Sequence, residues 1–90
     1  MKELGYIKID DVLELVKLVH RVNMETRHYA DFDFCGFSTS VFVMENGFEY
    51  PGRNWDFVGR FSFYEPSDKE NDVNKFCKIR DYLKGLLGEL

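Results

Sequence analysis

The chain has 90 residues, of which 44% are hydrophobic and 17% aromatic, and its formal net charge at pH 7 is −4. Ninety residues are expected to form a single domain, 1–90, because each of two smaller domains would be too small to bury a useful core. The aromatic content excludes a disordered tail. The mild acidity argues against a protein that binds nucleic acid directly by neutralising its phosphates.

Targeting and membrane signals are not expected from the residue pattern. The most apolar stretch, residues 12–22, contains four charged or titratable side chains. This pattern predicts neither a signal peptide nor a membrane span, so we expect a cytoplasmic protein with no membrane partner. Cys35 and Cys77 lie far apart in the sequence and are expected to be reduced thiols in that compartment.

The first expected elements are a short strand or extended lead-in over residues 5–9 and a helix over residues 11–26. Asp11 and Glu14 have the spacing of a capping box, in which the first carboxylate accepts a backbone N–H and the second reaches back. The apolar residues that follow recur at helical spacing and predict one buried stripe. That stripe is Val12, Leu15, Val16, Val19 and Val22.

Residues 29–34 change to a period of two, which is typical of a half-buried strand. One face of this strand would carry Ala30, Phe32 and Phe34, and the other Tyr29, Asp31 and Asp33. The glycine and hydroxyl residues of 35–40 predict a turn or a bulge. Whether residues 28–45 form one bent strand or two strands is left open by the pattern.

A hairpin is predicted where residues 41–44 meet Asn46-Gly47, because Asn-Gly is the strongest short-range hairpin signal. A two-residue turn there would place three pairs of residues opposite each other. These pairs are Glu45 with Phe48, Met44 with Glu49, and Val43 with Tyr50. Pro51-Gly52 would then end the strand.

The last expected elements are a strand over residues 57–64 and a helix that ends near residue 87. Phe57, Phe61 and Phe63 share one face of this strand and are expected in the core, whereas Val58, Arg60, Ser62 and Tyr64 share the other. Ser67 and Glu70 have capping-box spacing at the helix start, and Gly88 is a plausible stop. The helical stripe comprises Val73, Phe76, Ile79, Leu83, Leu86 and Leu87.

These elements predict an α+β fold, a two-layer sandwich with the order (β)αβββ(β)α. Consecutive strands joined by short turns favour a mostly antiparallel sheet of three to five strands. Two amphipathic helices each need their apolar stripe covered, and packing both on one face of the sheet does so most economically.

The opposite face of this sheet would then have no covering layer. Its expected residues combine aromatic, Met and Arg side chains with charges, a composition typical of interface cores. They are Tyr29, Asp31, Asp33, Phe42, Met44, Glu49, Val58, Arg60 and Tyr64. The adjacent loop brings Arg53, Asn54 and Trp55, which either contact a partner or, for Trp55, fold back as a lid on the core.

Catalytic and metal-binding patterns are weak in this sequence. His28 and Cys35 are separated by an odd number of residues, which places them on opposite faces of an extended chain and argues against a dyad. Asp31 and Asp33 could share a hard cation with Asp56 or Glu49, an alternative that rests on two carboxylates without a dedicated loop. We therefore expect neither an enzyme nor a cofactor.

The leading hypothesis is a small acidic protein that binds another protein stoichiometrically and inhibits it. Toxin-immunity proteins and phage anti-defence proteins, including anti-CRISPRs, are similar in size and composition, and the analogy goes no further. Residues 10–35 carry six acidic and three basic side chains, which favours a partner with a basic or nucleic-acid-binding surface. A homodimer that buries Phe42, Met44 and Tyr64, and a small metal-binding or enzymatic domain, are the alternatives.

Overall fold

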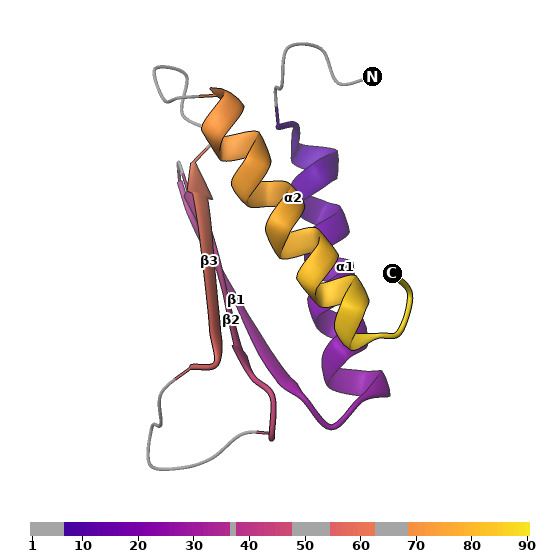
Figure 1. Cartoon of the computed structure of the whole chain (residues 1–90). Helices are drawn as coiled ribbons and strands as arrows, with labels where there is room; N and C mark the ends of the chain where they lie inside the picture. The colour runs from indigo at the N-terminus through magenta and orange to yellow at the C-terminus, as the bar shows by residue number, and fades with distance from the viewer. Residues whose placement is uncertain (1–6, 37, 48–54, 63–68) are drawn as a thin grey trace.

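Two helices and one antiparallel sheet make up the fold in the computed structural model, which describes residues 7–36, 38–47, 55–62 and 69–90. The elements are α1 (Ile9–Glu25), β1 (Tyr29–Cys35), β2 (Ser38–Met44), β3 (Phe57–Ser62) and α2 (Lys69–Leu86). The strands lie in the order β1-β2-β3, and both helices cover the same side of the sheet (Figure 1). The predicted two-layer α+β fold is confirmed.

The chain between residues 28 and 45 forms two strands rather than one bent strand. Cys35 pairs with Ser38 across a two-residue connection that begins with Gly36, whose φ is 51°. A positive φ is accessible to glycine without a steric penalty, so this glycine permits the sharp reversal. The break that the sequence predicted at residues 35–40 is therefore a β-hairpin turn.

The predicted pairing of Val43 with Tyr50 across the Asn46-Gly47 turn is wrong. A turn does form there, since the Gly47 N–H donates to the Met44 carbonyl at 3.2 Å. However, Val43 pairs with Ala30 on one side and Phe57 on the other, so Tyr50 cannot be its partner. The dipeptide sets the local turn, whereas β3 takes the free edge of β2. The other two predicted pairs involve Phe48 and Glu49, which lie outside the described residues.

Helix α1 begins two residues earlier than predicted because Asp11 caps the helix from within its first turn. The Lys8 N–H donates to the Asp11 carboxylate at 2.8 Å, and Lys8 itself is extended. Asp11 is thus the reaching-back member of the cap and not its first residue, which corrects the predicted roles. The helix ends at Glu25, where the Thr26 N–H still donates to the Val22 carbonyl.

The buried stripe of α1 differs from the prediction at its margins. Leu18 is buried and Val16 is exposed, although the sequence pattern favoured Val16. These two residues flank the stripe on opposite sides, so periodicity alone does not decide between them. Because α1 packs on both β1 and α2, the tertiary contacts set which margin is covered.

The core lies between the helices and the helix-facing side chains of the sheet. Its fully buried members are Leu15, Val22, Thr39, Val41, Val43, Ile79 and Leu83. Phe61 meets Phe76 edge to face at 5.7 Å, and Phe57 packs half-buried against the same cluster. Phe34 is 50% exposed, so its expected core position is wrong. It lies at the turn end of β1, away from the buried start of that strand at Ala30. Phe63 is outside the described residues.

Thr39 carries a buried hydroxyl that has no hydrogen-bond partner within the described ranges. We expect Thr39→Val to stabilise the fold by about 1 kcal/mol, because valine keeps the shape and removes an unsatisfied polar atom. Urea denaturation measures this free energy. Thr26→Val is the control and should destabilise, since the Thr26 hydroxyl accepts from the His28 N–H at 3.0 Å. A less stable Thr39→Val variant would contradict the prediction.

Helix α2 ends as predicted at its glycine. Gly88 has a φ of 74°, and the Glu89 N–H donates back to the Lys84 carbonyl at 2.8 Å. These features define a Schellman cap, which satisfies the last carbonyls of a helix. Arg21 of α1 also pairs with Glu89, so the end of the chain is held against the first helix. The predicted cap residue Ser67 at the other end of α2 is outside the described residues.

Candidate protein-binding face

The side of the sheet away from the helices is referred to below as the open face. Strand alternation determines which residues lie on it. Val41 and Val43 are fully buried under the helices, so Phe42 and the other residues that alternate with them point to the open face. The described residues of the open face are Tyr29, Asp31, Asp33, Cys35, Ser38, Ser40, Phe42, Met44, Val58, Arg60 and Ser62. All described residues that were predicted for this side of the sheet do lie on it.

Trp55 packs on the open face. Its ring is 6.1 Å from the Tyr29 ring and nearly parallel to it, and 5.2 Å from the Phe42 ring. The alternative in which Trp55 is a lid on the main core is therefore wrong. Stacked and tilted rings at these distances attract one another beyond their area burial, so the three aromatics form one cluster across β1 and β2.

Met44 does not provide contact area on this face. It pairs with Tyr29 in the sheet register but is only 4% exposed, because neighbouring side chains already cover it. The prediction that Met44 contributes to partner contact is thus wrong.

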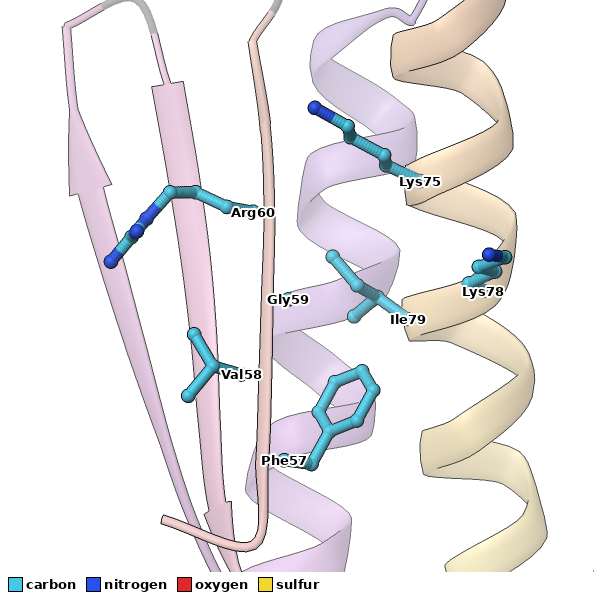
Figure 2. A pocket seen from close by; sticks show the side chains of 7 residues that line it. All are labelled: Phe57, Val58, Gly59, Arg60, Lys75, Lys78 and Ile79. Carbon is cyan, nitrogen blue, oxygen red and sulfur yellow. The ribbon is translucent and has the colours of Figure 1, made fainter. Parts of the chain in front are cut away.

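Arg60 also contacts Phe42. Its guanidinium lies 5.9 Å from the centre of the Phe42 ring, and its Nε donates to the Ser40 hydroxyl at 3.0 Å. Phe42 thus contacts both an indole and a cation, and the arginine is restrained by a hydrogen bond. Figure 2 shows Arg60 and Val58 directed away from the helices. Val58 remains 48% exposed beside them.

The charges of the open face are segregated by strand. Asp31 and Asp33 are exposed on β1, where they lie opposite Phe42 and Ser40. Arg60 stands on β3, on the other side of β2. The face therefore has an acidic margin, an aromatic centre and a basic margin, which a partner with complementary charges would contact in one orientation.

The remaining predicted site residues fall elsewhere. Asp56 accepts a hydrogen bond from the Glu45 N–H at 2.7 Å at the end of β2. Within the described ranges, no three His, Cys, Asp or Glu side chains gather as a potential metal site. Glu49, Arg53, Asn54 and Tyr64 lie outside the described residues.

A second polar cluster, at the end of β2, was not predicted. The Tyr82 hydroxyl of α2 donates to the Glu45 carboxylate, and the Tyr82 ring stacks on Phe57 at 4.0 Å. His28 Nδ1 lies 2.6 Å from the Glu45 carbonyl oxygen. Burial, together with the hydrogen bond from Tyr82 to Glu45 and the charge of Glu45, raises the pKa of Tyr82. Tyr82 is thus held neutral and ties α2 to the sheet. No sequence spacing signals these contacts between distant residues.

Comparisons of the chain with known protein families, curated proteins and solved structures find no match. Neither α1 nor α2, the helices of the described part, combines the length and the apolar content that a bilayer span requires.

Proposed function

We propose that the protein is a non-catalytic binding domain that acts by occupying the surface of another protein with its open face. The observation that carries this proposal is the contact of Phe42 with both Trp55 and Arg60. Tryptophan, tyrosine and arginine are the residue types most enriched among interface hot spots.

The restraint of these side chains favours binding. Immobilising a free, rotamer-rich side chain at an interface costs about 0.5–1.5 kcal/mol. Arg60 is already hydrogen-bonded to Ser40, and Trp55 is already packed on two rings. A partner would therefore meet a preorganised surface and would lose less affinity to side-chain ordering.

The acidic margin indicates the chemistry of the partner. Exposed Asp31 and Asp33 would attract a basic surface, and a surface that otherwise binds nucleic acid has that character. Blocking such a surface would make the protein an inhibitor, in the manner of immunity proteins and phage anti-defence proteins such as anti-CRISPRs. A cytoplasmic location belongs to the same proposal.

A matched pair of variants tests the proposal. Val58 of the open face and Leu13 of α1 are each 48% exposed, so glutamate at either position has a similar effect on burial. In pull-downs from nuclease-treated lysate of the native host, we expect the wild type to capture one protein stoichiometrically. Val58→Glu should weaken that capture by about tenfold or more, and Leu13→Glu should retain it. Circular dichroism verifies that both variants are folded.

Three outcomes would contradict parts of the proposal. Equal capture by both variants would exclude the open face as the contact. Capture that does not weaken with added salt would exclude steering by Asp31 and Asp33. A dimer in light scattering at micromolar concentration that Val58→Glu dissociates would instead assign the open face to self-association.

A further inference from the structure

The two edges of the sheet differ in how their backbone groups are satisfied. At β1, the side-chain amide of Asn23 donates to the Ala30 carbonyl and accepts from the Ala30 N–H, each at 2.8 Å. The next outward N–H, of Phe32, donates to the Asp31 carboxylate at 3.0 Å. Side chains thus occupy the backbone positions that an added strand would need along the first half of this edge.

At β3, the side chains of the described residues satisfy only one end of the edge. The Ser62 N–H donates to Asp72 of α2 at 3.1 Å, so the backbone N–H of Ser62 points away from β2. Successive residues of a strand direct their backbone groups to alternate edges, so the backbone groups of Arg60 and Val58 point outward, as those of Ser62 do. β3 pairs with β2 alone, and within the described ranges no group bonds the outward backbone of Val58 or Arg60.

A cavity of about 280 Å³ lies beside this free stretch of edge, between β3 and α2 (Figure 2). Phe57, Gly59 and Ile79 provide most of its apolar wall. Gly59 allows the helix to approach this closely, since a Cβ there would be 2.4 Å from Ile79 Cγ1. Unpaired backbone groups next to an apolar cavity are the two elements of β-strand addition, in which the backbone provides affinity and the pocket provides selectivity.

The charges around the cavity are of one sign. Among the residues that the structure describes, its lining includes Arg60, Lys75 and Lys78 and no acidic residue, although the whole chain has a net charge of −4. Both lysines are exposed on α2. A second copy of the chain joined edge to edge by a two-fold axis would bring these cations against their own counterparts, which disfavours self-pairing.

We propose that the β3 edge binds an extended acidic segment of another protein as a fourth strand. The segment would exchange backbone hydrogen bonds with Val58 and Arg60 and place one apolar side chain in the cavity. Its carboxylates would pair with Lys75 and Lys78. This site is separate from the acidic and aromatic parts of the open face, so it goes beyond the function proposed above.

Two labelled peptides that differ only in the sign of their charges test the proposal on the full chain. We expect Glu-Thr-Val-Thr-Glu to bind and Lys-Thr-Val-Thr-Lys not to bind in fluorescence anisotropy, because alternate residues of a strand share one face and so bring the valine and both charges to the α2 side together. The double variant Lys75→Glu/Lys78→Glu should weaken binding of the acidic peptide by about tenfold or more. An Asp31→Asn/Asp33→Asn variant should bind it no less tightly than the wild type, which separates this site from the open face. Equal binding of both peptides would overturn the proposal.

The backbone contact has its own test at Val58. Proline at this position removes an outward N–H without removing a bond to β2, whereas alanine keeps the N–H and shortens the same side chain. We expect Val58→Pro to lose the peptide and Val58→Ala to retain it. In the wild type, saturating peptide should slow hydrogen exchange at the Val58 and Arg60 amides. Unchanged exchange, or slowed exchange on raising the protein concentration without peptide, would overturn the proposal.

Discussion

Asn23→Ala is expected to lower the free energy of unfolding by about 2–3 kcal/mol. The side-chain amide bonds both backbone groups of Ala30, a residue that is buried. Its removal leaves a donor and an acceptor without partners, and each such loss costs about 1–3 kcal/mol, reduced where water can enter. Urea denaturation followed by circular dichroism measures the loss.

Two further variants make this result specific. Asn23→Asp keeps an acceptor for the Ala30 N–H and loses the donor to its carbonyl, so an intermediate loss of stability is expected. Met24→Ala changes the neighbouring residue, which is exposed on α1, and should alter stability by less than about 0.5 kcal/mol. If Asn23→Ala lowers the free energy of unfolding as little as Met24→Ala does, the two hydrogen bonds between Asn23 and Ala30 do not stabilise the fold.

Gly59→Ala is expected to destabilise the protein by about 1–3 kcal/mol, as overpacking does in a close-packed core. The added Cβ would lie 2.4 Å from Ile79 Cγ1 and 2.8 Å from Ile79 Cδ1. Ile79 is buried, so it has little room to move away. Either α2 shifts from β3 or the Ile79 side chain leaves its preferred rotamer, and both cost free energy.

A double-mutant cycle with Ile79→Val identifies the clash. Ile79→Val alone removes Cδ1 and should cost about 0.5–1.5 kcal/mol. In combination with Gly59→Ala the two losses should sum to more than the measured loss, because valine lacks the Cδ1 atom of the 2.8 Å contact and its remaining Cγ1 is less hindered from moving. Strictly additive losses in urea denaturation would show that Gly59 does not limit the approach of the helix.

Much of the candidate site follows from strand alternation. A period of two places Tyr29, Phe42 and Arg60 on one side of the sheet wherever the strands pair, and the structure has them there. The position of Trp55 does not follow, because no residue pattern determines onto which face a non-repeating segment folds. The burial of Met44 has the same origin, since it depends on neighbours that come from other parts of the chain.

The sequence by itself determined that strands lie between an N-terminal and a C-terminal helix and that the two helices form one layer, but it left open whether residues 28–45 form one strand or two. Those features depend on local periods, on Gly36 and Gly88 at sharp chain reversals, and on apolar stripes that must be covered. Tertiary structure alone decided that Val43 pairs with Phe57, that Asn23 of α1 caps the start of β1, and that Asp72 of α2 caps the end of β3. The physical reason is that local patterns act over one or two turns of chain. Register and edge capping depend instead on contacts between residues far apart in sequence.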